Sequence, residues 1–540
     1  MKRLSEFYTQ RIKRGLVRRL TLLKVASVAR EVARKEPKPS GAPVVFFKAS
    51  TGIDDLSWNS GFHLLTTWAL RLQGIPVAYF ACNSGLSKCV LGTNRDNPQK
   101  EMPCKSCVMQ SNALYAGVQV DKKTGTQVNW FNFQRDTEIQ NAIRDLDIDH
   151  LSRFTHHDIP LGALCLPGLR WVLRIHHLND DENTRYLLRE YILSAWNVAW
   201  KFSDFLDQTQ PRAVVVFNGQ FYPEATARYI AQKRGLRVIT HEVGLEPATA
   251  YFTEGEATAY PIRIPDEFEL NEAQNARLDA YLAKRFKGDF TMAGVKFWAD
   301  MKGLDEAFLQ KAAQFKQIVP IFTNVIFDTS QPHANTVFED MFDWLDLTLE
   351  IIQEHPETLF VIRAHPDELR VRKASRETVG GWVEMNKVTE LPNVIFVPSN
   401  ETLSSYELIL RSKFVMVYNS TIGLEASIMG MPVLCAGKAR FTQYPTVFFP
   451  QTVDEVRRKM QEFLDAESID VPAEFKRNAR RFLYYQLYRT SLPFGDFLEP
   501  SVRVTQTKLK SFELDELLNS ASVKTILDGV LNGGDFLLKE

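Results

Sequence analysis

The chain has 540 residues, which exceeds what one hydrophobic core usually organises and therefore predicts two large domains. Its composition, 45% hydrophobic and 24% charged, is that of a soluble globular protein. The 65 basic and 65 acidic residues cancel, which argues against a nucleic-acid binder, because such proteins usually carry a basic domain. No apolar stretch reaches the roughly 20 residues of a transmembrane helix and no secretory signal is visible, so we expect a cytoplasmic protein.

The N-terminal segment is locally basic, with twelve Lys or Arg among residues 1–38 against Glu6, Glu31 and Glu36. Apolar residues recur there at roughly helical spacing, at Ile12, Leu16, Leu20, Leu23 and Val28. The pattern predicts a basic amphipathic helix within residues 1–40. Such a helix either lies on an anionic membrane surface, which would make the protein peripheral at the inner face of the cell membrane, or packs one face on the body of the protein.

Short apolar runs alternate with helical patterns through the first half of the chain, which is typical of βαβ units and a parallel sheet. Strands are expected at residues 44–47, 75–80, 213–217 and 235–240, and helices at residues 59–72, 180–207 and 223–233. These elements predict an N-terminal Rossmann-like domain over residues 41–315, in which the polar stretch from about 255 to 317 is a connector.

A second set of the same kind begins near residue 318. Its strands are expected at residues 318–322, 359–365, 393–397, 414–418 and 432–435. A helix is expected at residues 336–355, and a further helix begins near residue 404. They predict a C-terminal Rossmann-like domain over residues 316–475, followed by a return helix and tail over 476–540. The expected fold class is therefore α/β, with two Rossmann-like domains facing across a cleft and an N-terminal basic helix. This architecture suits a two-substrate enzyme but does not name its reaction.

Polar residues follow several of the apolar runs in the second set. In an open α/β sheet, ligands bind just beyond the carboxyl ends of the strands, so these residues are expected to converge. Arginine and histidine suit a phosphate, and hydroxyls at a helix start suit an anion. The candidate binding residues are Thr323, Asn324, Arg363, His365, Pro366, Asn419, Ser420, Thr421, Gly423 and Glu425.

Several of these residues also have an ordinary structural interpretation. His365 could donate to a backbone carbonyl, and Ser420 or Thr421 could cap a helix in which Glu425 is a favourable first-turn charge. In the functional interpretation, Glu425 accepts hydrogen bonds from ribose hydroxyls, and Gly423 permits close approach of a ligand. The sequence leaves these alternatives open.

Three segments together resemble a known family: Arg363-Ala364-His365-Pro366, then Ser420-Thr421-Ile422-Gly423-Leu424-Glu425-Ala426, then Gly430-Met431-Pro432-Val433. They are similar to the C-terminal half of GT-B glycosyltransferases, and most of all to bacterial capsular polysaccharide biosynthesis proteins, including Kdo transferases. Bacterial sialyltransferases share a His-Pro motif and a later Ser-Ser/Thr motif that contact the CMP of the donor, and His365-Pro366 and Ser420-Thr421 match them. The resemblance covers roughly residues 315–445.

This resemblance implies a nucleotide-sugar donor, with CMP as the favoured nucleotide, and a glycan or lipid-linked acceptor bound by the N-terminal domain. It also implies that the catalytic centre needs no metal or other cofactor, because basic side chains and helix N-termini can stabilise the leaving phosphate. Asn218, Gly219 and Gln220, which follow a predicted strand, are the candidate acceptor-binding residues.

The catalytic base is harder to assign, because the Asp/Glu-Asp/Glu-Gly motif that supplies it in those sialyltransferases has no clean copy here. The nearest segment is His241-Glu242-Val243-Gly244, directly after a predicted strand. An inverting transfer needs a group that takes the acceptor hydroxyl proton, so Glu242 and His241 are the candidates, with His365 as a candidate acid. The alternative for Glu242 is a loop charge at the domain interface.

Four of the six cysteines cluster at Cys82, Cys89, Cys104 and Cys107, and the last two have Cys-x-x-Cys spacing. In a cytosolic protein such a cluster favours a structural zinc ion over disulfides. An iron–sulfur cluster and unligated cysteines are the alternatives. The pairs His156-His157 and His176-His177 lack a carboxylate at helical spacing, so we expect them to be surface or interface histidines.

Other activities share the expected architecture. One is a transferase of polyol phosphate from a CDP-linked donor, and another is a UDP-sugar 2-epimerase, which needs no acceptor. A third, of a different class, is a scaffold that binds a nucleotide without turnover. Donor hydrolysis and product identity would separate these alternatives.

Overall fold

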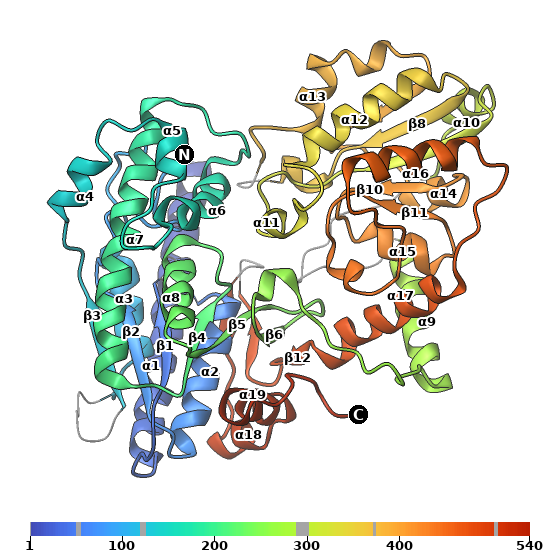
Figure 1. Cartoon of the computed structure of the whole chain (residues 1–540). Helices are drawn as coiled ribbons and strands as arrows, with labels where there is room; N and C mark the ends of the chain where they lie inside the picture. Colours follow the sequence, from blue (N-terminus) through green and yellow to red (C-terminus); the bar gives the residue numbers. More distant parts are fainter. Residues whose placement is uncertain (1, 50–55, 119–125, 288–301, 371–373, 502–505) are drawn as a thin grey trace. The chain divides into compact units, whose positions relative to one another are not determined.

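The fold is given by a computed structural model of the chain, which describes residues 2–49, 56–118, 126–287, 302–370, 374–501 and 506–540. It divides into two compact units (Figure 1). The first unit comprises Met1–Val172, Leu178–Thr258 and Tyr488–Glu540, and the second comprises Leu173–His177 and Ala259–Leu487. Among the described residues, no helix combines the length and the apolar character that crossing a membrane requires.

A sheet in the order β12-β6-β5-β4-β1-β2-β3 forms the centre of the first unit. Its strands are β1 (Val44–Lys48), β2 (Val77–Cys82), β3 (Gln127–Phe131), β4 (Ala213–Phe217), β5 (Arg237–Val243), β6 (Thr249–Glu254) and β12 (Leu492–Pro493). β1 to β5 are parallel, and β6 and β12 add an antiparallel edge. The four strands expected from the sequence are confirmed, whereas β3, β6 and β12 lie outside the predictions.

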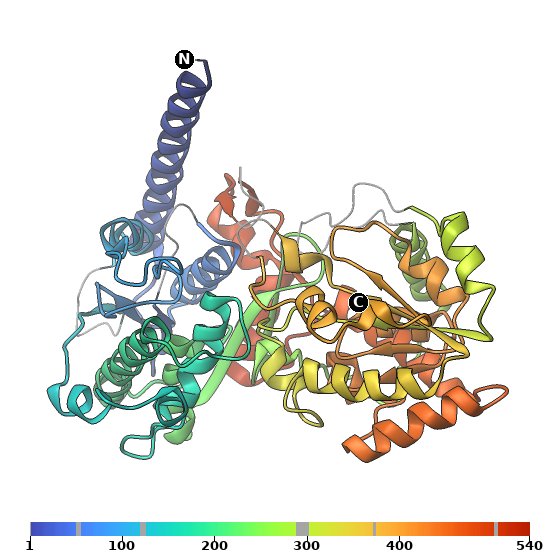
Figure 2. The same ribbon diagram turned by 90° about the horizontal axis from the view of Figure 1, so that it is seen from above.

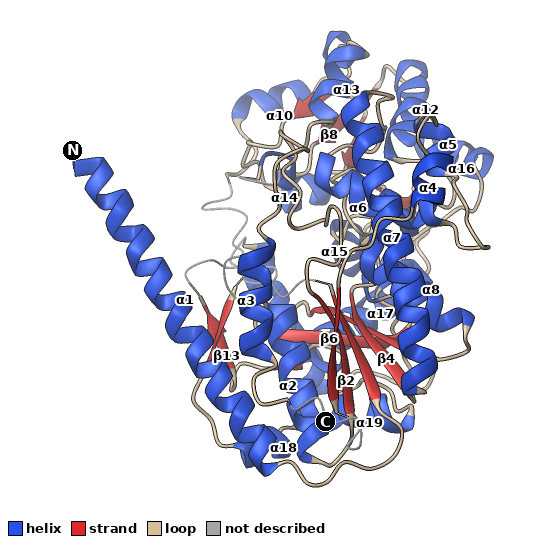
Figure 3. Cartoon of the chain, turned by 90° about the vertical axis from the view of Figure 1, so that its left-hand side faces the viewer, coloured by secondary structure: helices blue, strands red, loops and turns tan. Residues whose placement is uncertain are grey.

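Helices cover both faces of this sheet, as Figure 3 shows. Phe46 of β1 packs its ring edge-on against His63 of α2, whereas the adjacent Phe47 points to the other face and packs on Phe202 of α7. The helices of the unit are α1 (Lys2–Lys35), α2 (Trp58–Leu72), α3 (Cys104–Leu114), α4 (Thr137–Ala142), α5 (Ile148–Ser152), α6 (Leu161–Leu173), α7 (Glu182–Thr209), α8 (Tyr222–Lys233), α18 (Leu514–Asn519) and α19 (Ala521–Asn532). A short ribbon of β13 (Leu498–Pro500) and β14 (Thr507–Leu509) completes the unit.

The predicted N-terminal helix is present as α1, which extends away from the rest of the first unit (Figure 2). Its C-terminal half buries Val25, Ala29 and Val32 in the core of the unit. Further toward the N-terminus, three leucines one helical turn apart are more than half exposed: Leu16, Leu20 and Leu23. The helix therefore packs one face on the body of the protein and leaves a second apolar face uncovered.

The second unit is built on a sheet in the order β11-β10-β7-β8-β9, in which every neighbouring pair is parallel. Its strands are β7 (Gln317–Phe322), β8 (Thr358–Arg363), β9 (Val394–Val397), β10 (Val415–Val417) and β11 (Val433–Cys435). The surrounding helices are α9 (Glu272–Phe286), α10 (Glu306–Ala312), α11 (Gln331–Ala334), α12 (Met341–Glu354), α13 (Val379–Met385), α14 (Ser405–Leu410), α15 (Ile422–Ile428), α16 (Val453–Asp465) and α17 (Ala473–Tyr484). All five strands coincide with predicted ones.

The boundaries between the units differ from the predicted ones at three places. Residues 259–287, expected in a connector of the N-terminal domain, belong to the second unit because Arg285 of α9 forms a buried ion pair with Glu425 of α15. Residues 488–540 return to the first unit, where β12 pairs with β6. The predicted return helix is present as α17 with a π-helical extension through Arg489.

Leu173–His177 also belongs to the second unit, and His177 explains why. Its Nε2 lies 2.8 Å from Asp340 Oδ2 and its Nδ1 lies 2.5 Å from Glu377 Oε1. Hydrogen bonds to Asp340 and to Glu377 raise the pKa of His177 to about 10. Both carboxylates come from distant parts of the chain, so no carboxylate at helical spacing announces them in the sequence. His177 is more than half exposed, which agrees with the expected surface position, whereas His176 is buried.

This contact predicts a pH-dependent stability. The pKa of His177 in the folded protein lies above the usual 6.5, so the contribution is fully present below about pH 6.5 and is lost as the pH rises toward 10. We expect the thermal unfolding midpoint of the wild type to fall more between pH 6 and pH 9 than that of His177→Gln, measured by scanning fluorimetry. His157→Gln, in the first unit, is the control. An equal fall in wild type and His177→Gln would contradict the assignment.

Candidate functional site

The strand order of the second unit reverses between β7 and β10, which is where an open α/β sheet offers a ligand-binding crevice. The segments that follow these strands are joined, since the backbone N–H of Asn419 donates to Asn324 Oδ1 over 3.2 Å. On the other side of β7, the hydroxyl of Thr323 donates to the carbonyl oxygen of Arg363 over 2.9 Å. The predicted residues after β7, β8 and β10 are therefore brought to one edge of the sheet.

Ser420 and Thr421 carry the hydroxyls best placed to meet a ligand. The helix α15 begins at Ile422, and Thr421 precedes it without a capping hydrogen bond from its side chain. Neither hydroxyl makes a hydrogen bond within the part of the chain that the structure describes, and both residues are partly exposed. The capping interpretation is therefore not what the structure shows, and both hydroxyls are free to donate to a ligand oxygen.

His365 follows β8, and its ring is held by its own turn. The backbone N–H of Asp367 donates to Nδ1 over 3.1 Å, which places the proton of the neutral ring on Nε2. Burial lowers the pKa of His365, and the negative charges of Asp367 and Asp328 oppose this only in part. The ring is thus neutral at pH 7 and presents an N–H donor, which suits a bound phosphate better than it suits a general acid. Pro366 follows as the first residue of a short 3₁₀ turn.

Arg363 ends β8 with a side chain that is almost fully buried. Its guanidinium donates to the carbonyl oxygen of Leu403, which fixes the loop after β9 beside the end of β8. Burial lowers the pKa of Arg363 to about 10, so the group remains charged at neutral pH. Arg363 therefore supplies positive charge next to His365 while also holding the loop in place.

Glu425 has a different surrounding from the one that a ribose-binding role needs. Both of its oxygens are engaged, one by Arg285 at 2.6 Å and the other by the hydroxyl of Tyr406, and the side chain is buried. Gly423 likewise has a packing role, because a Cβ there would lie 2.9 Å from Val417 Cγ2 of β10. Both residues hold α15 against the sheet, so they position the two hydroxyls at its start.

In the first unit, Glu242 lies at the end of β5 and is held by two side-chain amides. Asn59, in the first turn of α2, donates to Oε1 over 3.0 Å, and Asn218, directly after β4, donates to Oε2 over 3.0 Å. The turn at Asn218 and Gly219 has a positive φ at both residues. Gln220 is turned toward Glu256, to which its side chain donates over 2.8 Å. Of the predicted acceptor residues, Asn218 thus holds the fixed carboxylate, whereas Gln220 is engaged by Glu256.

The position of His241 contradicts its prediction as a catalytic base. Successive side chains of a strand point to opposite faces, and His241 is completely buried against Phe252 and His63. Burial lowers the pKa of His241 to about 3, so the ring is neutral and out of reach of a bound acceptor. Of the two candidates for the base, the structure leaves Glu242.

Lys48 and Glu224 are two buried charged residues whose charges influence each other, and neither is among the residues predicted from the sequence. Lys48 ends β1 and is almost fully buried; burial lowers its pKa to about 8, opposed by the charge of Glu224. Burial raises the pKa of Glu224, in the first turn of α8, to about 7. The sequence did contain a signal for Lys48, because it is a charged residue at the end of an otherwise apolar strand. In an open α/β sheet, ligands bind just beyond such strand ends.

Comparison with known proteins supports the resemblance read from the motifs. Residues 288–446 match the family model described as capsule polysaccharide biosynthesis protein, and this region contains the ends of β7, β8 and β10. Protein FixF of Sinorhizobium fredii (strain NBRC 101917 / NGR234) is 24% identical over 312 residues, which are 57% of this chain and 67% of that protein. The resemblance to capsule polysaccharide biosynthesis proteins is therefore confirmed for this region.

Two solved structures are similar at a lower level. KpsC of Thermosulfurimonas dismutans, a β-Kdo 2,4 transferase, aligns with 57% of this chain and 87% of its own, at 11% identity and a TM-score of 0.34. UDP-GlcNAc 2-epimerase from Neisseria meningitidis aligns with 82% of this chain and 98% of its own, at 11% identity and a TM-score of 0.23. Likeness at this level leaves the reaction to be argued from the residues.

The ion pair of Glu425 predicts how its removal will act. Glu425→Gln leaves Arg285 buried without a counter-charge, which typically costs about 3–5 kcal/mol. We expect a clear loss of stability in urea unfolding, whereas Glu462→Gln, in an exposed pair with Lys459, should change it by less than about 1 kcal/mol. A stable Glu425→Gln protein that has lost nucleotide affinity would instead restore the ribose-binding role.

Proposed function

We propose that the protein is a metal-independent glycosyltransferase of the GT-B type, which moves a sugar from a nucleotide-sugar donor to a glycan or lipid-linked acceptor in the synthesis of a bacterial surface polysaccharide. The observation that carries this proposal is the set of donors at the binding edge of the second unit. It comprises the free hydroxyls of Ser420 and Thr421 and the Nε2–H of His365. The match of residues 288–446 to capsule polysaccharide biosynthesis proteins supports it.

The second unit would hold the donor by its phosphate. The hydroxyls of Ser420 and Thr421 and the ring N–H of His365 donate to phosphate oxygens, and Arg363 adds positive charge close by. These interactions strengthen as the bond between the sugar and the phosphate breaks and negative charge grows on the leaving nucleotide. The resemblance to sialyltransferases favours CMP as that nucleotide.

The first unit would hold the acceptor, with Glu242 as the base. An acceptor hydroxyl gives its proton to the carboxylate while its oxygen forms a bond to the anomeric carbon, and the nucleotide leaves with the electron pair of the broken bond. Asn59 and Asn218 keep the carboxylate in one orientation. Asn218, Gly219 and Gln220 would line the acceptor site around it.

A nucleotide screen tests the donor site. We expect one nucleotide among CMP, CDP, UDP, GDP and ADP to raise the unfolding midpoint, since a ligand at a hundred times its Kd stabilises by about 2.7 kcal/mol. His365→Ala and the double variant Ser420→Ala/Thr421→Ala should each weaken binding about tenfold or more, because hydrogen bonds to charged groups contribute about 1.5–3 kcal/mol. Ser468→Ala, an exposed hydroxyl elsewhere in the second unit, is the control.

Equal binding by wild type and both site variants would overturn the donor site. With the donor known, Glu242→Gln should bind it normally and transfer about 10²- to 10⁴-fold more slowly, whereas Glu254→Gln on the same sheet should not differ from wild type. Turnover without an acceptor would point to the 2-epimerase alternative, and transfer of a polyol phosphate to the CDP-polyol alternative. Binding without any turnover would point to a scaffold.

We also propose that α1 brings the protein to an anionic membrane surface. Leu16, Leu20 and Leu23 form one exposed apolar face on a helix that is rich in Lys and Arg, which is the pattern of interfacial helices. A lipid-linked acceptor would give such a contact a purpose. The protein would then act at the inner face of the cell membrane.

Sedimentation with lipid vesicles tests this contact. We expect the full chain to bind vesicles that contain phosphatidylserine, and to bind less at high salt because salt screens the basic residues. Replacing Leu16, Leu20 and Leu23 by Ser should abolish binding, whereas Leu410→Ser, an equally exposed leucine of the second unit, should not. Unchanged binding by the triple variant would rule out this face.

A further inference from the structure

Four cysteines that the proposed transfer reaction does not use lie in and around the long insert that follows β2. Residues 83–103, which join β2 to α3, form a stretch of 21 residues without a helix or strand. Loops of more than about 15 residues without secondary structure are uncommon inside compact domains and usually serve a function. The insert is nevertheless anchored, because its Ser87 contacts Glu190 of α7 and its Lys88 accepts a hydrogen bond from Tyr222 of α8.

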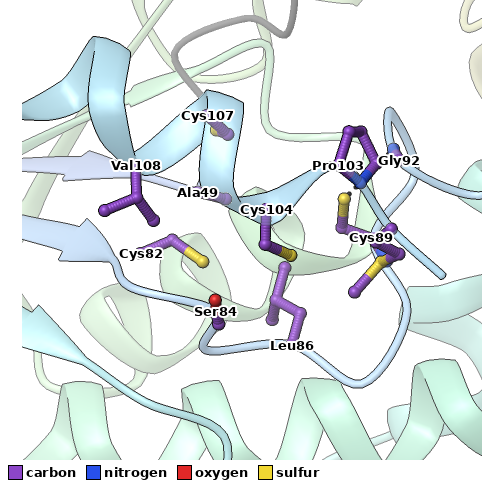
Figure 4. A pocket seen from close by; sticks show the side chains of 11 residues that line it. Ala49, Cys82, Ser84, Leu86, Cys89, Gly92, Pro103, Cys104, Cys107 and Val108 are labelled. Atoms are coloured by element: carbon purple, nitrogen blue, oxygen red, sulfur yellow. Dashed lines mark hydrogen bonds between the residues drawn. The ribbon is translucent and has the colours of Figure 1, made fainter.

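The four cysteines of this region line a single cavity of about 30 Å³ (Figure 4). Cys82 ends β2, Cys89 lies in the insert, and Cys104 and Cys107 lie one turn apart in the first turn of α3. The remaining lining is mostly apolar, with Ala49, Leu86 and Val108 among it. Four thiols from three separate segments therefore meet in one small apolar cavity, which an unligated set of loop cysteines does not explain.

Two of the sulfurs are already held in the way that metal-bound thiolates are. The backbone N–H of Gly85 donates to Cys82 Sγ over 3.2 Å, and that of Gly92 donates to Cys89 Sγ over 3.1 Å. Both are Cys-x-x-Gly turns, and a Cβ at Gly92 would come within 2.8 Å of Cys89 Sγ. Hydrogen bonds of this kind orient a ligand and stabilise its negative charge in the second shell of a metal.

We propose that Cys82, Cys89, Cys104 and Cys107 bind one zinc ion in tetrahedral coordination. Four thiols release four protons to solvent as one Zn²⁺ binds, so the site gains four Zn–S bonds and a net charge of −2. The described residues contain no three His, Cys, Asp or Glu side chains already gathered at metal-binding distance, so binding requires the four thiols to draw together.

The cavity is small, at about 30 Å³, and a single ion is the simplest occupant for four converging thiols. Four thiolate ligands leave no open position, so the ion is structural. Ala49, which lines the cavity, directly follows Lys48, so the ion would also fix the end of β1.

Metal analysis of the purified full-length protein tests the proposal. We expect about one zinc per chain in the wild type and less than a tenth of that in Cys104→Ser/Cys107→Ser. Cys435→Ser is the matched control, because Cys435 is a buried thiol outside the cavity that donates to the carbonyl of Tyr418, as a serine hydroxyl also can. Cobalt added in place of zinc should give the strong visible absorption of a tetrahedral thiolate site.

A second measurement on the wild type covers the case in which the double variant does not fold. A mercurial that titrates the thiols should release the zinc as it reacts, with four thiols consumed per ion. Wild type that contains no zinc and gives no cobalt spectrum would overturn the proposal. Bound iron and sulfide in place of zinc would show an iron–sulfur cluster and overturn the proposal. Zinc that remains bound in the folded double variant would overturn it too, because the metal would then lie at another site.

Discussion

The burial of parallel strands is the constraint on which both candidate sites depend. A parallel strand covered on both faces is apolar along its length, so its polar side chains gather where it ends. In the second unit this gathers Asn324, His365 and Ser420 after β7, β8 and β10, and in the first unit it places Asn218 and Glu242 after β4 and within the end of β5. The sheets therefore decide where chemistry can occur, and the residues at the strand ends decide which chemistry it is.

Two histidines show how far position within a strand determines function. Burial lowers the pKa of both His241 and His365, so both rings are neutral at pH 7. His241 lies inside β5, where its ring is packed against Phe252, and it can only serve the core. His365 lies two residues beyond β8, where the N–H of Asp367 fixes its tautomer and its Nε2 can meet a ligand. A displacement of a few residues separates a core histidine from one that can meet a ligand.

The elements that follow from local pattern could be predicted from the sequence, and the contacts that join distant segments could not. Apolar runs located β1, β4, β7, β8 and β10, and the polar residues after them marked the edge where a ligand site is proposed. The start of α12 was missed by five residues because the cap at Asp340 was not recognised. The ion pair of Arg285 with Glu425 joins residues 140 positions apart, so neither the true boundary near residue 259 nor the structural role of Glu425 was visible in any local pattern.

The most direct test of the account is hydrogen–deuterium exchange of the full chain with and without the nucleotide that it binds. The hydroxyls and the ring N–H proposed to hold the donor phosphate lie in short segments, so a bound nucleotide should slow exchange there. We predict protection in peptides that cover residues 364–368 and 419–423, with no change in peptides from α16 or β3. Protection confined to other segments, or none at saturating nucleotide, would contradict the assignment of the donor site to the carboxyl edge of the second sheet.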